Sequence, residues 1–238
     1  PIRRGGGIFL AASGAKIIHN IVVNNKVENE VWCFGAGVSS GPPFIPTFII
    51  LEENVFRDNR SPGFDAASGG GASLGSSGRI INNVFEKNIV RSIDGSASGG
   101  GMEVQSVPDI PNEVLIKGNI FIHNKALQQE GATYWLGGCG GGMSIILTKG
   151  IIENNIIQHN EISAVTNSFG AGVLFDFPPD GIYFRNNIVS HNTFSGAGAC
   201  YGCGFAIWYG NQTIENNLFE KNDATFGGGG WIGDAFSF

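Results

Sequence analysis

Apolar and polar positions along this chain follow a repeated phrase and show no helical spacing. The phrase reads apolar-x-x-Asn-apolar-apolar-x-x-Asn, and its copies recur at intervals of 29 to 36 residues. A fixed period in this range indicates a stacked repeat architecture. The paired asparagines are Asn20/Asn25, Asn54/Asn59, Asn83/Asn88, Asn119/Asn124, Asn155/Asn160, Asn187/Asn192 and Asn217/Asn222.

A Gly-x-Gly motif followed by an apolar or small residue separates the copies. Glycine makes up 38 of the 238 residues, which disfavours long helices, and the apolar residues fall in short β-branched blocks such as Ile80-Ile81. We therefore expect an all-β solenoid of about seven to eight coils, each with three short strands. The motifs span 5–7, 35–37, 69–71, 99–101, 140–142, 170–172, 202–204 and 228–230.

Alignment of the copies predicts the role of each column. Asparagine tolerates the left-handed backbone of a sharp bend, and stacked asparagine amides stabilise in-register parallel strands. We therefore assign both roles to the paired asparagines. The column two residues before the first asparagine alternates in charge in its last four members, which predicts ion pairs between neighbouring coils. These members are Lys117, Glu153, Arg185 and Glu215.

With these repeats, the chain resembles the right-handed parallel β-helix repeat proteins, the group that includes the pectin-lyase-like folds. The segment Gly5-Gly6-Gly7-Ile8, with Phe56-Arg57-Asp58-Asn59 and Phe85-Glu86-Lys87-Asn88, is also similar to the paired GGA(I/V/L) and FxxN motifs of polymorphic outer-membrane autotransporter passengers. The resemblance covers nearly the whole chain. It implies a right-handed coil. The sequence shows no second domain, so we expect a single β-helix domain over residues 1–238. The composition, poor in charge and rich in Gly, Asn and Ser, predicts an extracellular or cell-surface location.

Composition narrows the range of partners. The net charge of −6 and the lack of a Lys/Arg cluster argue against nucleic acid, and no apolar run reaches membrane-spanning length. The repeat continues to both ends without a polar cap. We therefore expect a segment of a longer solenoid or a subunit that stacks end to end. The expected partners are flanking coils, further copies of the chain or a polysaccharide, and no cofactor is expected.

The strand after each glycine motif carries the candidate catalytic residues. Its outward column is predicted to place Asp176, Trp208 and Asp234 in three consecutive coils. Two coils separate the acids by about 9.6 Å, the outer edge of the range for an inverting glycosidase. Asp176 and Asp234 would then act as acid and base, with Trp208 as a sugar platform. Tyr134 and Trp135, in the longest insertion, are candidates for glycan binding.

Histidine and cysteine offer weaker candidates. His123, His159 and His191 occupy one column in successive coils, where an exposed polar ladder is favoured over a metal site, and no metal site is predicted. Cys200 and Cys203 form a C-x-x-C pair that either bridges locally or supplies two small buried thiols.

The scarcity of clustered titratable groups favours a non-catalytic extracellular module, adhesin-like or filament-forming. Two alternatives remain open from the sequence. One is a carbohydrate-active enzyme, a glycoside hydrolase or polysaccharide lyase, that works along the face after the glycine motifs. The other is a glycan-binding module without catalysis.

Overall fold

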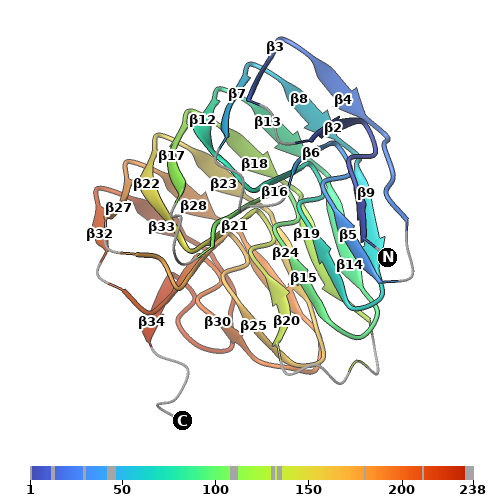
Figure 1. Cartoon of the computed structure of the whole chain (residues 1–238). Helices are drawn as coiled ribbons and strands as arrows, with labels where there is room; N and C mark the ends of the chain where they lie inside the picture. Colours follow the sequence, from blue (N-terminus) through green and yellow to red (C-terminus); the bar gives the residue numbers. More distant parts are fainter. Residues whose placement is uncertain are drawn as a thin grey trace.

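The protein is a parallel β-helix in this computed structural model, which describes residues 2–11, 14–28, 31–41, 47–107, 112–129, 132, 136–179, 181–210 and 212–233. All strand pairs are parallel and link one coil to the next. Figure 1 shows the coils stacked in sequence order, from blue to red. The described residues contain no helix, and therefore no helix that is long and apolar enough to cross a membrane.

Five sheets, which we name A to E, run along the stack. Sheet A contains β1 (Ile2–Arg4), β5 (Trp32–Phe34), β10 (Ala66–Ser68), β15 (Ser96–Ser98), β20 (Leu136–Cys139), β25 (Asn167–Phe169) and β30 (Cys200–Tyr201). Sheet B contains β2 (Ile8–Leu10), β6 (Val38–Ser40), β11 (Ala72–Leu74), β16 (Met102–Gln105), β21 (Met143–Ile146), β26 (Val173–Asp176), β31 (Phe205–Trp208) and β34 (Gly230–Gly233).

Sheets C, D and E complete each coil. Sheet C contains β3 (Ala15–Ile18), β7 (Phe48–Glu52), β12 (Ser77–Ile81), β17 (Asn112–Lys117), β22 (Thr148–Glu153), β27 (Ile182–Arg185) and β32 (Thr213–Glu215). Sheet D contains β4 (Ile21–Val23), β8 (Val55–Arg57), β13 (Val84–Glu86), β18 (Ile120–Ile122), β23 (Ile156–Gln158), β28 (Ile188–Ser190) and β33 (Leu218–Glu220). Sheet E contains β9 (Arg60–Gly63), β14 (Ile89–Ser92), β19 (Lys125–Gln128), β24 (Glu161–Ser163) and β29 (Thr193–Ser195).

The eight strands of sheet B confirm the predicted number of coils, but the expectation of three strands per coil was wrong. The segments between the second asparagine and the next glycine motif form sheets E and A. They do so because small residues such as Ala67, Ala97 and Ala126 alternate inward there, and the strands on either side can pack closely over them.

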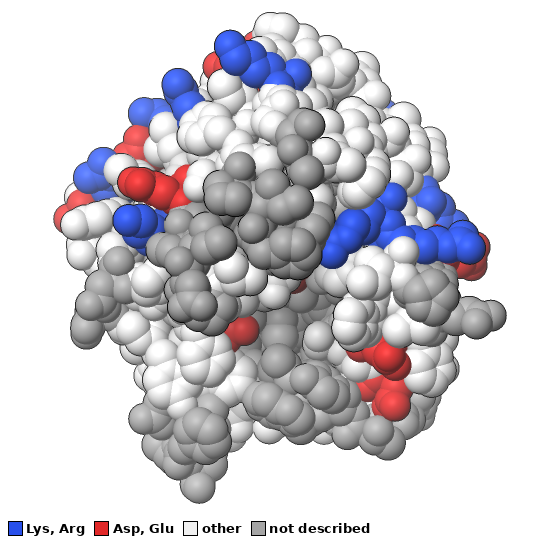
Figure 2. All heavy atoms as spheres, in the orientation of Figure 1, with Lys and Arg blue, Asp and Glu red and all other residues white. Residues whose placement is uncertain are grey.

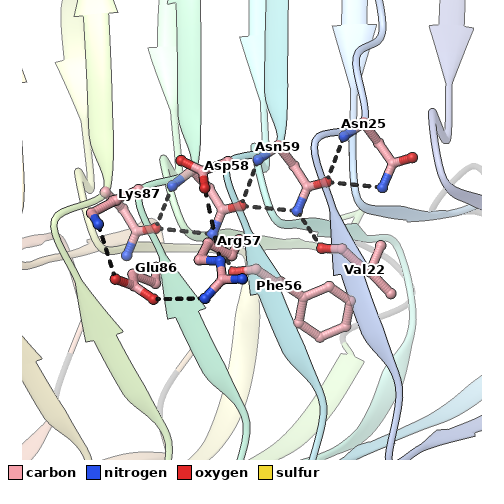
Figure 3. A network of polar contacts seen from close by, with 10 residues as sticks. Val22, Asn25, Phe56, Arg57, Asp58, Asn59, Glu86 and Lys87 are labelled. Atoms are coloured by element: carbon pink, nitrogen blue, oxygen red, sulfur yellow. Dashed lines mark hydrogen bonds and ion pairs between the residues drawn. The ribbon is translucent and has the colours of Figure 1, made fainter.

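The paired asparagines form two hydrogen-bonded ladders, as predicted. In the second ladder the Asn59 backbone N–H and side-chain Nδ2 both donate to Asn88 Oδ1, at 3.1 and 3.0 Å, and Nδ2 also donates to the Val22 carbonyl at 2.9 Å (Figure 3). The same pattern recurs in successive coils through Asn124 and Asn160. These side chains are fully buried, so each ladder fixes the register of the stack from inside.

The paired asparagines were expected to adopt the left-handed backbone conformation themselves, and this expectation was wrong. The residue with positive φ is the one directly before each asparagine. His123, before Asn124, has φ 57°, and Asn82, before Asn83, has φ 54°. A non-glycine residue in this region costs about 1 kcal/mol or more. The bend at this residue directs the side chain of the following asparagine into the coil. The hydrogen bonds of that asparagine in the ladder therefore offset the cost of the bend.

The glycine motifs fold inward against the second ladder. The first glycine of the first seven motifs has positive φ, for example 62° at Gly99. A Cβ atom added to Gly101 would lie 2.6 Å from the Gly142 carbonyl oxygen and 3.0 Å from Asn124 Nδ2. Contacts this short exclude any side chain, so the coil is pinched between the glycine motif and the second asparagine.

The pinch divides the interior into two lobes. The large lobe, between sheets B, C and D, holds bulky side chains, including a stack of Phe56, Phe85 and Phe121 with ring centroids 4.9 and 4.7 Å apart. The small lobe, between sheets E and A, holds mainly alanine, valine and cysteine, such as Val90 and Cys200. On the outside, the same pinch makes sheets A and B meet around the glycine motifs.

The predicted alternation of charge on sheet C is confirmed. Glu153 accepts ion pairs from Lys117 on one neighbouring coil and from Arg185 on the other, both at 2.9 Å, and Arg185 continues to Glu215 at 3.8 Å. These two cations lower the pKa of Glu153, chiefly through the hydrogen bond from Lys117. The pairs therefore reinforce the register that the asparagine ladders set.

We expect Asn124→Ala to destabilise the protein by about 3 kcal/mol or more, since each buried polar group left unpaired costs about 1–3 kcal/mol. The groups affected are the Asn88 backbone N–H, the Asn88 side-chain amide and the Phe85 carbonyl. Urea unfolding measures the effect. Asn20→Ala, at an exposed end of the first ladder, is the matched control and should cost about 1 kcal/mol. Equal losses in the two variants would contradict a cooperative internal ladder.

Candidate functional site

Sheets A and B present two outward columns that face a common groove. On sheet A the column runs Arg4, Phe34, Ser68, Ser98, Cys139, Phe169, Tyr201 and Phe226. On sheet B it runs Phe9, Ser39, Ser73, Glu103, Ser144, Leu174, Ala206 and Trp231. Serine predominates in the middle coils and aromatic residues at the ends, so the groove is deepest in the middle.

A cavity of about 280 Å³ occupies the middle of this groove. It is lined by Trp32, Phe34, Ala66, Ser68, Ser96, Ser98, Glu103, Gln105, Cys139, Ile146, Leu174 and Asp176. Figure 2 shows this face of the molecule hollowed, with acidic atoms visible inside the hollow and Lys and Arg on the flanks. The volume lies just below the usual range for small-molecule sites, about 300–1,000 Å³.

Glu103, on β16, is the most strongly perturbed acid of the groove. Its side chain is buried with 2% exposure, and this burial raises its pKa to about 7. Hydrogen bonds with Ser98 and Ser68 oppose the shift, and the charge of Asp176 adds to it. Arg4 also interacts with Glu103, and its guanidinium lies 4.6 Å from the centroid of the Phe34 ring. Burial therefore keeps this carboxyl group protonated to a higher pH than an exposed glutamate.

Asp176, at the end of β26, is the second perturbed acid. Burial raises its pKa to about 6. Its Oδ1 atom is buried and has no hydrogen-bond partner among the residues that the structure describes. An acceptor left in this state is costly unless water or a ligand donates to it. A bound hydroxyl group would supply that donor. Asp176 lies two coils from Glu103 and two residues further along its strand.

Aromatic side chains close the groove beyond Asp176. The Phe169 ring lies 4.8 Å from Trp208 and 5.4 Å from Trp231, so rings from sheet A contact rings from sheet B across the groove. Tyr201 continues the column, 5.1 Å from Phe169 and 5.5 Å from Trp231. The cavity therefore has one aromatic end wall, while exposed Trp32 lies toward its other end.

The predicted alignment of Asp176 with Asp234 is not what the strand register shows. Trp208 pairs with Asp176 on one side, as expected, but with Gly233 on the other. The last coil contains four consecutive glycines, and Gly227, with φ 61°, starts the turn in place of Gly228. The whole strand is thus displaced by one residue from the predicted register. Asp234 itself lies outside the described residues.

The structure describes Trp208, the predicted sugar platform, but not the two aromatic residues of the longest insertion. Trp208 is only 3% exposed, because its ring is stacked between Phe169 and Phe177, so it supports the end wall and offers no open face. Tyr134 and Trp135 lie outside the described residues. Of the predicted site residues, the structure therefore places Asp176 in the cavity and Trp208 directly behind it.

Glu103 was not selected from the sequence because it stands alone in a column of serines. Two signals were nevertheless present. Glu103 occupies an outward position on the strand after a glycine motif, and the strand before the same motif carries Ser96 and Ser98. What the sequence did not reveal is that the pinch turns sheet A toward sheet B, which places Ser98, and Ser68 of the preceding coil, against the carboxyl group.

Two other groups of side chains are weaker candidates for a functional site. A depression of about 350 Å³ over sheet E is bordered by Lys26, Arg60 and Arg91, but these side chains are exposed, and Lys26 already pairs with Glu28 at 2.9 Å. The three stacked histidines have ring centroids 5.2 and 4.8 Å apart. Within the described residues, no three His, Cys, Asp or Glu side chains come together to hold a metal ion.

The raised pKa of Glu103 makes stability depend on pH in a defined direction. Since the folded state holds the proton up to about pH 7 and the unfolded state only to about 4.5, the contribution is complete below pH 4.5 and is lost as pH rises through 7. We expect wild-type protein to lose roughly 3 kcal/mol over this interval relative to Glu103→Gln. Urea unfolding from pH 4.5 to 8 measures it. Glu113→Gln, at an exposed position on β17, should keep the wild-type pH profile; an identical profile for Glu103→Gln would refute the assignment.

Comparison with known proteins agrees with the geometry. No curated protein and no solved structure gives a significant match. The family described as "Right handed beta helix region" matches residues 6–237, almost the entire chain. The repeat, the parallel sheets and this match together show that the chain belongs to the right-handed β-helix family.

Proposed function

We propose that this protein is an extracellular β-helix that binds a carbohydrate in the cavity between sheets A and B and hydrolyses it with Glu103 and Asp176. The observation that carries the proposal is that the buried carboxyl group of Glu103 and the half-buried one of Asp176, with pKa values of about 7 and 6, line one cavity. Perturbed acids in a cleft are typical of catalytic sites. The extracellular location rests on the composition, poor in charge and rich in Gly, Asn and Ser.

The lining of the cavity suits a sugar. The hydroxyl groups of Ser68, Ser96 and Ser98 and the amide of Gln105 offer hydrogen-bond donors and acceptors, while exposed Trp32 offers apolar surface. Carbohydrate ligands present both kinds of surface, because ring faces are apolar and ring edges carry hydroxyl groups. A volume of about 280 Å³ holds one or two sugar rings, so we expect the site to take a short saccharide or the end of a longer chain.

The two acids differ in the way that hydrolysis requires. Glu103, with the higher pKa, is the proton donor to the oxygen of the departing sugar, and Asp176 is the base that takes a proton from water. Water then adds across the glycosidic bond, and the proton lost to Asp176 balances the one given by Glu103. Two coils and two strand residues separate the Cα atoms of Glu103 and Asp176 by roughly 12 Å. The use of Asp176 as a base toward water corresponds to the inverting reaction, in which the water molecule lies between the two carboxyl groups.

Binding and catalysis are tested separately. Calorimetry with neutral and uronate oligosaccharides should find a ligand, and Trp32→Ala should weaken its binding about tenfold. Glu103→Gln and Asp176→Asn should each lower hydrolysis at least 100-fold, the usual size of an acid–base contribution, with binding largely kept. Glu113→Gln is the control that removes an acid outside the groove. Binding without turnover would leave a glycan-binding module, and the absence of binding across the panel would reject the proposal.

A second candidate is the adhesin-like or filament-forming module, with self-stacking through the end coils. The observation that favours it is the apolar surface there. Ile21 is 72% exposed on the first coil, and Leu218 and Ile232 are 50% and 64% exposed on the last two. Light scattering and electron microscopy distinguish this candidate, since stacking predicts a mass that grows with concentration and linear particles, whereas a concentration-independent monomer would exclude it.

A further inference from the structure

The glycine motif of the seventh coil brings two cysteines together inside the small lobe. Cys200 begins strand β30 of sheet A in this coil, Gly202 turns the chain with φ 62°, and Cys203 follows the turn. The turn directs the side chains at its first and fourth positions to the same interior space. In the sixth coil the equivalent positions hold Ser168 and Ala171, which are also buried. The glycine turn thus buries the side chains at its first and fourth positions in both coils, whichever residues occupy them.

The two sulfur atoms are closer than separate thiols can be. Cys200 Sγ and Cys203 Sγ lie 2.6 Å apart, and both residues have 0% exposure. A disulfide bond requires about 2.03–2.05 Å. Only a small movement separates the pair from bond length, whereas unbonded sulfur atoms would have to move apart inside a closely packed lobe.

We propose that Cys200 and Cys203 form a disulfide bond that closes the glycine corner of the seventh coil. In its formation each thiol loses one hydrogen, and an external disulfide, such as oxidised glutathione or a protein disulfide, is reduced to two thiols. Because both sulfur atoms are buried, the exchange takes place before the eighth coil packs over this corner. The bond also implies that the chain folds in an oxidising compartment.

The bond has a structural consequence for the groove. Tyr201 lies between the two cysteines, and its side chain points outward, 5.1 Å from Phe169 and 5.0 Å from Phe226. A bridge between residues 200 and 203 therefore fixes the corner that presents this ring to the aromatic end wall. The inference does not depend on carbohydrate binding, because it rests on the corner and its two sulfur atoms alone.

Thiol counting tests the bond directly. The full chain is refolded with oxidised glutathione, denatured and treated with iodoacetamide, with and without prior reduction. We expect two alkylated cysteines without reduction and four after it, together with a proteolytic fragment two hydrogens lighter that contains residues 200 and 203. Four alkylated cysteines without reduction, or a bridge between other cysteines, would overturn the proposal.

A designed variant separates the bond from simple packing. Cys200→Ser with Cys203→Ala copies the sixth-coil corner, so the fold should be kept and confirmed by circular dichroism. Oxidised wild type should unfold about 5 °C higher than this variant and lose that difference on reduction, while the variant should be insensitive to reductant. Cys139→Ser serves as the control and should keep the wild-type response. Equal insensitivity of wild type and the double variant would contradict the bond.

Discussion

The contact between the glycine motif and the second asparagine ladder is the constraint on which the rest of this structure depends. At Gly101 the backbone of one strand approaches the amide of Asn124 and the carbonyl of the next coil so closely that no Cβ atom fits. The asparagine is rigid there because it is bonded to the coils above and below. Every coil is therefore pinched at the same place, and the pinch aligns along the stack.

The groove is the external side of that pinch. A simple triangular coil would expose its outward columns to water on a convex surface, where an isolated glutamate would be solvated. Here sheets A and B face each other across the glycine motifs, so the serines of one sheet cover the Glu103 carboxyl of the other. Burial without a strong cationic partner raises its pKa, and the nearby Asp176 raises it further. The chemistry proposed for the site is thus a consequence of the corner geometry.

The repeat made much of the fold predictable, because its signals are local and recur in every coil. The ladders, the inward Phe56-Phe85-Phe121 column and the charge alternation through Glu153 needed only the alignment of one coil with the next. The relation between sheets A and B is different in kind. It depends on the angle of the turn at the glycine motif, which the sequence does not give. In addition, a segment of small residues is compatible with either a loop or a strand.

The errors at the site have the same origin. Four consecutive glycines in the last coil allowed two registers, and the turn at Gly227 decides between them, so that Gly233 pairs with Trp208 where Asp234 was expected. Trp208 was expected to be open because its column is outward, but neighbouring rings cover it. Glu103 seemed isolated because its partners come from the preceding sheet. In each case the missing information was the packing between sheets, which periodicity does not encode.

The closed groove is tested most directly by measuring the pH at which the Glu103 carboxyl group titrates. Carbon-13 NMR of protein labelled at the glutamate carboxyl carbons gives this midpoint, and Glu103→Gln assigns the signal. We expect a midpoint near pH 7, well above the ordinary value for glutamate, because the carboxyl group is buried in the groove that the pinch creates. A midpoint near 4.5, the ordinary value for glutamate, would show that water reaches the carboxyl group freely and would contradict both the closed groove and its proposed chemistry.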